Sequence, residues 1–177
     1  MFLQRLLKPG PVRSVGESLY AATVAQARTP ALYAELGAPD TPDGRFEVYT
    51  LHVVLVLDRL RGVGSEAAAV SQALFDAYIS GLDNGLRELA VGDLSVGKTM
   101  RRLGEAFYGR AKALTAAFDA LPDRAALDGL LTRTVFGGAD DEPAAKLGDY
   151  LLEARAALDA TPKETLLAGE IAWPALA

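Results

Sequence analysis

The segment from Pro42 to Arg61 constrains the fold of this chain more than any other. It runs for about 20 residues without a turn signal, and positions 48–57, VYTLHVVLVL, contain no Asp, Glu, Lys or Arg. Its valines suit a strand by propensity, but an ordinary strand has roughly 3–10 residues. The length therefore predicts a helix, and the missing charges predict that this helix lies in the core.

Start signals for further helices recur along the chain. Ser14 and Glu17 have the spacing of a capping box, which predicts a helix from there to about Arg28. Thr29-Pro30 and Thr41-Pro42 each place a capping Thr before a Pro suited to the first helical position. A second capping box at 161–164, TPKE, predicts a short terminal helix.

Apolar residues at helical spacing fill the remaining segments. Gly81 and Gly85 lie inside one of these helices, where close packing or a bend would explain them equally well. The expected helices are a short one ending at Gly37, then 65 to about 90, 93 to about 120, 123 to 136 and 143 to 160. We predict an all-α protein, a single compact domain over residues 14–177 with about six or seven helices.

The composition excludes several classes of protein. A net charge of −5 argues against nucleic-acid binding, so no DNA partner is expected. The chain has no Cys and one His, which excludes disulfides, thiolate nucleophiles and multi-histidine metal sites. No run of about 20 apolar residues could span a bilayer. We expect no metal, no cofactor and no catalytic residue.

Residues 1–13 form a separate N-terminal segment. Its apolar run is too short for a signal peptide, and two prolines interrupt it. Two interpretations stay open: a flexible terminus, or a segment that rests on an anionic membrane surface. The second depends on apolar and basic residues together, namely Phe2, Leu3, Arg5, Leu6, Leu7, Lys8 and Arg13.

The stretch 92–110, GDLSVGKTMRRLGEAFYGR, opens with the phosphate-binding pattern G-x-x-x-x-G-K-[ST]. A working loop of this kind follows a β-strand, but the preceding residues, GLRELAV, continue a helical period. Asp93 would also repel phosphate. We therefore interpret the match as coincidental and expect no nucleotide hydrolysis. The residues that make it are Gly92, Gly97, Lys98 and Thr99.

As a helix capped by Asp93, the same stretch is amphipathic. Its apolar face comprises Val96, Met100, Leu103, Phe107, Leu114 and Phe118. Lys112 and three cations near the start of the helix fall on the opposite flank. This flank is either a solvated face or a docking edge for a membrane surface, ribosomal RNA or an acidic partner. The partner-binding residues predicted for such an edge are Lys98, Arg101, Arg102, Tyr108 and Arg110.

His52 lies in the middle of the charge-free segment. No carboxylate or second histidine accompanies it at ligand spacing, because Val48 and Tyr49 occupy the preceding turn. We interpret His52 as a neutral, hydrogen-bonded core residue. The alternative is a helical carrier or enzyme for a small apolar ligand, with His52 as the polar contact in its cavity.

Two long stretches together resemble the ubiquinol–cytochrome c chaperone family, in the short form found in α-proteobacteria. They are LYAELGAPDTPDGRFEVYTLHVVLVLDRLRG and ALFDAYISGLDNGLRELAVGDLSVGKTMRRLGEAFYGR, and the resemblance covers residues 18–136. Where the mitochondrial members carry Trp at two positions, this chain has Arg45 and Val53. The most specific parts are LYxxLGxPDTxxxxF from Leu32 to Phe46, the Leu51-His52 pair, and the helix from Asp93 to Arg110.

The resemblance implies an all-helical chaperone without enzymatic activity. Mitochondrial relatives act with a partner protein on newly made cytochrome b, near the ribosome and the inner membrane, during assembly of the cytochrome bc1 complex. It follows that the expected client is a membrane protein, cytochrome b. The expected location is cytoplasmic, with peripheral contact to the inner membrane.

Overall fold

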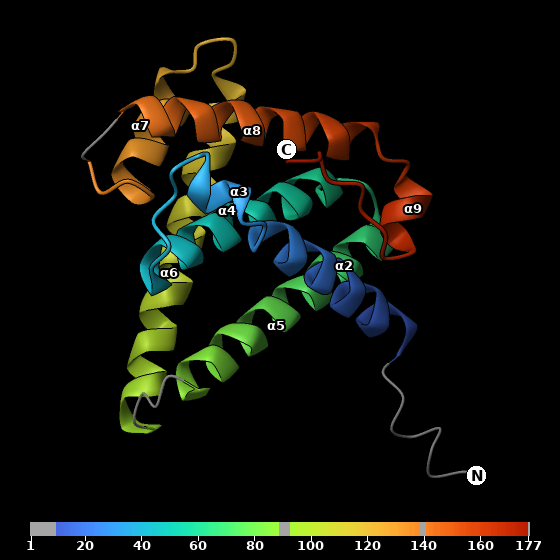
Figure 1. Cartoon of the computed structure of the whole chain (residues 1–177). Helices are drawn as coiled ribbons and strands as arrows, with labels where there is room; N and C mark the ends of the chain where they lie inside the picture. The colour runs from blue at the N-terminus through green and yellow to red at the C-terminus, as the bar shows by residue number, and fades with distance from the viewer. Residues whose placement is uncertain (1–9, 89–92, 139–140, 177) are drawn as a thin grey trace.

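The computed structural model describes residues 10–88, 93–138 and 141–176. Within these ranges helices joined by turns and loops account for the structure and no strand is present, so the predicted all-α class is confirmed (Figure 1). Short helices of 4 and 5 residues bring the number of described helices slightly above the prediction. The helices are α2 (Pro11–Ala27), α3 (Ala31–Ala34), α4 (Pro42–Leu60), α5 (Ser65–Glu88), α6 (Asp93–Asp119), α7 (Ala125–Thr134), α8 (Asp141–Ala160) and α9 (Lys163–Leu167).

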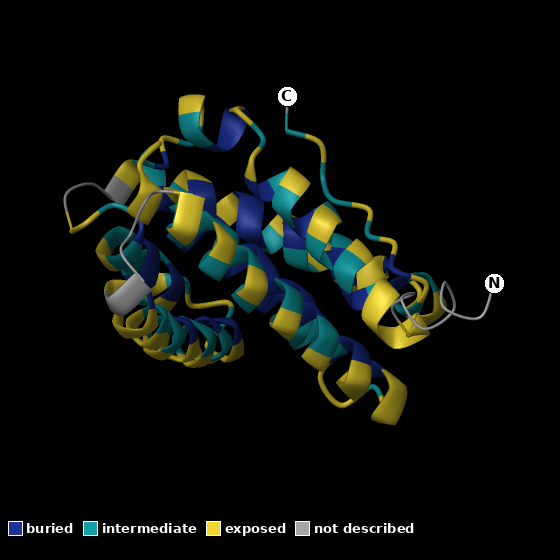
Figure 2. Cartoon of the chain, turned by 90° about the horizontal axis from the view of Figure 1, so that it is seen from below, coloured by how far each residue is buried: buried dark blue, intermediate teal, exposed yellow. Residues whose placement is uncertain are grey.

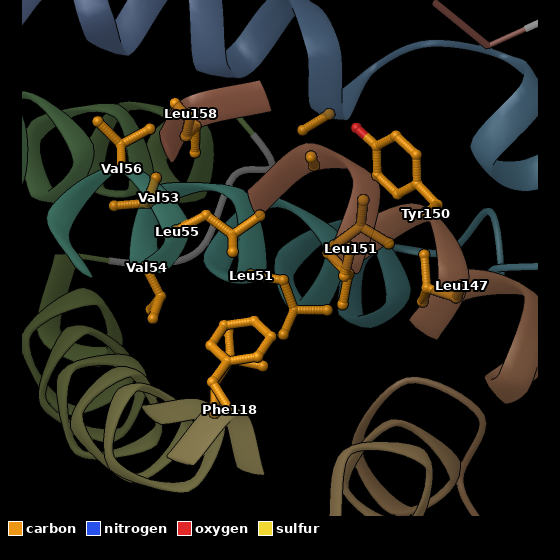
Figure 3. Close-up of a cluster of buried hydrophobic side chains, with 14 of the residues drawn as sticks. Leu51, Val53, Val54, Leu55, Val56, Phe118, Leu147, Tyr150, Leu151 and Leu158 are labelled. Atoms are coloured by element: carbon orange, nitrogen blue, oxygen red, sulfur yellow. The ribbon is translucent and has the colours of Figure 1, made fainter. Parts of the chain in front are cut away.

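The charge-free segment forms α4, which lies at the centre of the fold (Figure 1). α4 contacts α2, α5, α6 and α8, and every residue from 50 to 56 is buried. Residues of α4 meet Phe118 of α6 and the apolar face of α8 in the core (Figure 3). A fully buried Leu or Val contributes about 1.5–3 kcal/mol, so this helix is the main source of apolar stabilisation.

α2 and α5 pack closely against each other, and a glycine makes this possible. A Cβ atom at Gly16 would lie 2.5 Å from Cβ of Ala73 and 2.7 Å from the backbone nitrogen of Leu74. α7 and α8 form a second contacting pair on the other side of α4. Buried and exposed residues alternate along the helices, as expected for amphipathic helices around one core (Figure 2).

The start of α4 confirms one predicted cap, whereas the start of α2 contradicts another. Thr41 accepts a hydrogen bond from the backbone N–H of Gly44 at 3.1 Å, and a Pro follows at the first helical position. The predicted start at Ser14 is wrong, because α2 begins at Pro11 after Gly10. A Pro at the first helical position extends the helix upstream, and Glu17 pairs with Arg13 instead of closing a capping box.

Residues 11–13 therefore belong to α2, while the rest of the expected N-terminal segment, 1–9, lies outside the described residues. The predicted box before α9 is also wrong, since α9 has no side-chain cap. Thr161 Oγ1 instead donates to Ala157 O at 2.8 Å in the preceding helix. Before α7, the N-cap is Arg124 without a side-chain cap, although Asp123 Oδ1, one residue upstream, accepts from the N–H of Ala125 at 3.0 Å.

Candidate functional site

A surface groove of about 420 Å³ is the most distinctive feature outside the core. Its walls come from α2, α4, α5 and α6, together with Tyr33 of α3. The first half of α4, from Pro42 to Tyr49, lines the groove, while most of the second half is buried in the core. We call this feature the α2–α6 groove.

Aromatic side chains line the α2–α6 groove. Tyr20, Tyr33, Phe46 and Tyr49 all contribute to its wall. The rings of Tyr20 and Tyr49 meet edge to face with centroids 5.9 Å apart, and Tyr33 Oη donates to Ala27 O at 2.6 Å. Such rings present a large apolar area with few rotatable bonds, which suits the binding of apolar side chains.

Two glycines of α5 shape the same groove. A Cβ atom at Gly81 would lie 1.7 Å from Tyr20 Oη, so this glycine accommodates the tyrosine. At Gly85 a Cβ would meet nothing within 4 Å, and the position opens into the groove. Close packing therefore explains Gly81, and exposure to the groove explains why Gly85 needs no partner.

Tyr49 has a buried hydroxyl group for which the described residues supply no hydrogen-bond partner. Burial raises the pKa of Tyr49 well above its ordinary value, the nearby Tyr20 hydroxyl raises it further, and the guanidinium of Arg28 opposes this shift by a smaller amount. The hydroxyl is therefore protonated at neutral pH and lies near that of Tyr20, away from solvent. Buried polar groups in folded proteins are nearly always paired, so an unpaired one requires an explanation.

Three arginines from different parts of the chain line the groove: Arg28 after α2, Arg45 on α4 and Arg102 on α6. Arg45 pairs with Asp40, and its guanidinium carbon lies 5.4 Å from the centre of the Tyr33 ring. Among the residues described, Arg28 and Arg102 form no ion pair. Two cations of the groove thus remain available to a ligand.

The amphipathic interpretation of 93–119 is confirmed. Positions 96, 107, 114 and 118 are buried, and 100 and 103 are half-buried. Gly97, Lys98 and Thr99 lie within α6, and no strand precedes them in the part of the chain described, so the phosphate-binding match has no structural basis. Gly92 and the side chain of Asp93, the predicted cap, lie outside the described residues.

The five predicted partner-binding residues do not lie together. Lys98, Arg101 and Arg102 are exposed on one end of α6, and Arg101 is 3.3 Å from Glu105. Only Arg102 lines the α2–α6 groove. The other two, Tyr108 and Arg110, lie further along the helix.

Arg110 is engaged inside the molecule. Its guanidinium donates two hydrogen bonds to the carboxylate of Glu47 on α4, at 2.9 and 2.7 Å. This hydrogen bonding raises the pKa of Arg110 further, so its guanidinium stays charged. The side chain of Glu47 is 10% exposed and that of Arg110 29%, so the pair joins α4 to α6 in a largely buried setting.

Tyr108 is 65% exposed and borders a second groove of about 390 Å³. It packs on Phe107, with ring centroids 5.7 Å apart, and on Phe75 at 6.0 Å. Arg61 at this groove is bonded to Asp58 and Thr115. This second groove therefore carries an exposed aromatic ring, but its arginine already has partners.

His52 is fully buried in a hydrogen-bonded network. Nδ1 lies 2.7 Å from Val48 O and must donate to it, because a carbonyl only accepts. Nε2 therefore accepts from Tyr150 Oη, also at 2.7 Å. Burial lowers the pKa of His52 to about 4, so the ring is neutral, as predicted. The C-terminal segment covers the site, with Trp173 meeting the His52 ring edge to face at 5.3 Å.

Neither groove reaches His52. Neither of them therefore supplies the cavity that the alternative interpretation requires, a small apolar ligand held by this histidine. The described residues also include no group of three side chains suited to a metal ion. None of the helices described combines the length and hydropathy needed to cross a bilayer.

Sequence reasoning missed most of the α2–α6 groove. It named Arg102, but not Arg28, Tyr20 or Tyr49, which lie on two other helices or directly after them. A signal was present in the two interior glycines of α5, because such glycines often mark close approach or an open surface. That signal does not identify the elements that face them.

Comparison with known proteins identifies relatives of this chain. The family model described as ubiquinol-cytochrome C chaperone matches residues 34–173. A solved structure described as the Cbp3 homolog from Brucella abortus is 37% identical, with a TM-score of 0.84, covering 99% of this chain and 97% of that one. The search of curated proteins gave no match. The family match over most of the chain and the agreement in fold lead to one conclusion: this chain belongs to the ubiquinol–cytochrome c chaperone family.

Proposed function

We propose that this protein is a non-enzymatic assembly chaperone for the cytochrome bc1 complex. In this proposal it captures an apolar segment of newly made cytochrome b in the α2–α6 groove. Family membership supports the assembly role. The observation that carries the capture step is the groove itself, an open, aromatic-lined surface of about 420 Å³ in an otherwise well-packed helical protein.

The groove has the character of a site for an apolar helix. Amphipathic or apolar helices bind proteins by placing side chains one turn apart into a hydrophobic groove. Tyr20, Phe46 and Tyr49 provide apolar area at a low entropic cost. A newly made membrane protein exposes such segments before its partners cover them, so a chaperone groove of this kind would shield them from aggregation.

Lys98 and Arg102 form a basic approach to the groove. They are four residues apart on α6 and therefore share a face, and both are exposed. In the described part of the chain neither forms an ion pair. Positive charge at the edge of a groove accelerates encounter with an acidic client or with an anionic membrane surface, and this effect weakens with salt.

The remaining predictions from sequence fit this proposal in different ways. Tyr108 stays a predicted partner contact, and it borders the other groove. Arg110 also stays a predicted partner contact, although its guanidinium is bonded to Glu47. The proposed site of action is the cytoplasmic side of the inner membrane, where the client is inserted, with peripheral contact to the membrane or the ribosome.

Filling the groove is the direct test. Gly85→Trp places a large side chain where a Cβ meets nothing, so the fold should be retained while the groove is blocked. The matched control is Gly104→Trp, since Gly104 is also a helical glycine with nothing within 4 Å and lines neither groove. Tagged variants are expressed in the native host, and cytochrome b that co-purifies is measured.

Gly85→Trp should lose cytochrome b, while Gly104→Trp should retain it. Equal capture by both folded variants would overturn the proposal. Deletion of the chain should also lower haem b absorbance in membranes, because cytochrome b would not be assembled; unchanged bc1 spectra would argue against any assembly role.

Reversing the basic approach tests steering separately. Lys98→Glu with Arg102→Glu should reduce capture strongly at low salt and less at high salt. The control is Arg133→Glu with Lys163→Glu, which reverses two other exposed charges that line neither groove. If the control variant loses as much cytochrome b, the net charge of the protein, and not the basic residues beside the groove, is responsible for the loss.

A further inference from the structure

The segment that follows α9 runs back over the body of the molecule in an extended form. Residues 171–176, IAWPAL, have no helical or strand structure and return from α9 toward the centre of the fold (Figure 1). Gly169 precedes them with a φ of +88°, which turns the chain out of α9. Ile171, Trp173 and Leu176 are half-buried against the core, whereas the alanines between them are exposed. We call residues 171–176 the strap.

Three helices supply the surface under the strap. The ring of His52, on α4, lies 5.3 Å from that of Trp173 and 5.5 Å from that of Tyr150 on α8. Gln26 of α2 donates through Nε2 to Tyr150 Oη at 3.0 Å and to Pro174 O at 3.1 Å. The buried network around His52 thus ends on a backbone carbonyl of the strap. Proteins that bind extended peptides combine such main-chain hydrogen bonds with contacts to alternate side chains.

The contacts of the strap are those of a bound peptide rather than of a secondary-structure element. Within the described ranges, the bond from Gln26 to Pro174 O is the one hydrogen bond that joins residues 171–176 to the rest of the chain. Nε1 of Trp173 is buried, and the described residues offer it no hydrogen-bond partner. An unpaired buried donor costs free energy that a permanent part of a core normally avoids. The remaining contacts are apolar, and another segment with similar side chains could make them.

We propose that α2, α4 and α8 form a docking surface for an extended segment with an aromatic side chain, and that the strap is its occupant in this structure. Trp173 anchors the segment on His52, and the carbonyl of the next residue accepts from Gln26. That residue is Pro174, which has no N–H group for the surface to satisfy. The docking surface is distinct from the α2–α6 groove, which none of these residues lines. A partner with an aromatic residue followed by proline has the chemistry to replace the strap.

The test is binding of the strap sequence from a separate molecule. The probe is a fluorescein-labelled peptide with the sequence of residues 170–176, EIAWPAL, and its binding to the full chain is measured by fluorescence anisotropy. The native chain should bind the probe weakly, because its own strap competes at an effective concentration on the order of millimolar. Trp173→Ala removes the anchor, frees the surface and should bind the probe roughly tenfold more tightly.

Equal affinities of the native chain and Trp173→Ala, or no binding of the probe to either, would overturn the inference. Far-UV circular dichroism checks that the variant is folded. If it is not, Leu176→Ala takes its place with the same expectation, because it removes a different half-buried side chain of the strap.

Further variants locate the probe. In the Trp173→Ala chain, Gln26→Ala removes the donor to the carbonyl and should weaken the probe roughly fivefold. Gln72→Ala is the matched control, since that side chain bonds to Asp76 within α5, and it should have no effect. Gly85→Trp blocks the α2–α6 groove and should also leave the probe bound. Affinity that is retained in Gln26→Ala, or lost in Gly85→Trp, would place the probe elsewhere and overturn the inference.

The native chain reports on its own strap, because Trp173 is the one tryptophan of the sequence. Gln26→Ala should shift the emission of Trp173 to longer wavelength as the strap is released, with the far-UV circular dichroism unchanged. An unchanged emission spectrum would show that the strap is a fixed part of the core, and would overturn the inference. Light scattering that finds a native dimer but a Trp173→Ala monomer would place the strap on a second copy, and would overturn its assignment to its own chain.

Discussion

The polar groups on two faces of a single helix, α4, differ in whether they have hydrogen-bond partners within the chain. On the core side, Glu47, Thr50 and His52 are buried and each has a partner within the chain. On the groove side, Tyr49 lies between these residues in sequence, and its buried hydroxyl lies near that of Tyr20 without a hydrogen bond of standard geometry among the described residues. The arginines that share its groove, Arg28 and Arg102, likewise form no ion pair in the part described.

This difference separates polar groups that build the fold from those available to a ligand. A buried polar group costs free energy when unpaired, so a structural role requires that its partners come from the same chain. The pairs of Glu47 and His52 lie in regions that the apolar core surrounds. The groove that Tyr49 lines is open, and a partner from another molecule can reach its aromatic wall. The following predictions test whether this distinction holds.

The largest effect is expected from breaking the pair between Glu47 and Arg110. Glu47→Ala leaves the half-buried Arg110 guanidinium without its carboxylate and should lower the free energy of unfolding by about 2–3 kcal/mol. Urea denaturation measures this. The exposed pair of Arg101 with Glu105 is the control, and Glu105→Ala should change stability little. Similar losses for both would mean that burial of the first pair contributes nothing.

The pH dependence of stability tests the other core group, His52. Its pKa is about 4 in the folded state, below an unfolded value near 6.5, so the unfolded state binds more protons between these values. Stability from this group is complete above pH 6.5 and is lost as pH falls. Between pH 7 and pH 5 the loss should be about 2 kcal/mol.

His52→Gln provides the comparison, because the chain has no other histidine. Its stability should change less over the same pH interval, even if its absolute stability is lower. Parallel pH profiles for the native chain and the variant would show that His52 does not titrate as its burial implies.

Two glycines test the same contrast between the packed core and the open groove, through packing instead of hydrogen bonding. Gly16→Ala would force a Cβ against Ala73 and the backbone of Leu74, which should cost roughly 1–2 kcal/mol after the gain in helix propensity. Gly85→Ala adds a methyl group to the open groove and should instead stabilise by up to about 1 kcal/mol. Thermal unfolding compares the two. Destabilisation by Gly85→Ala would indicate that the groove is closed in solution.

The smallest expected change in stability is that for removal of the Tyr49 hydroxyl, and it tests most directly whether this group has a partner. Tyr49→Phe removes a hydroxyl that has no partner within the described chain and should leave stability unchanged or raised by up to about 1 kcal/mol. Tyr150→Phe removes the hydroxyl that contacts His52 and Gln26, and should cost about 1–3 kcal/mol. A loss of similar size at Tyr49 would show that its hydroxyl is paired in solution, with that of Tyr20 the nearby partner.

Local patterns predicted the helices well because each depends on neighbouring residues. The length and lack of charge of the segment 48–57 identified the central helix, and Thr41 before Pro42 identified its start. The errors were also local, and arose where two signals competed. A Pro at position 11 began α2 upstream of Ser14, and Thr161 bonded backwards to Ala157 instead of capping α9.

Local sequence patterns could not identify side-chain partners that lie far apart in the sequence. Arg110 appeared available on the edge of its helix, but it bonds to Glu47, 63 residues away. His52 was interpreted as a hydrogen-bonded core residue, yet its partner Tyr150 lies 98 residues away and has no local signal. Many residues could satisfy the same donor or acceptor, and only the packing of helices selects one.

The sequence by itself determined that this chain is all-α, that α4 is its core, and that α6 has an apolar face and a basic flank. Helical periodicity and the exclusion of charge from the core act over one or two turns, and both can be read directly. The tertiary structure alone decided that α2, α4, α5 and α6 enclose a groove, and that Tyr49 and Arg28 face it together. A groove is the space that packed helices leave between them, so it depends on contacts that no single segment encodes.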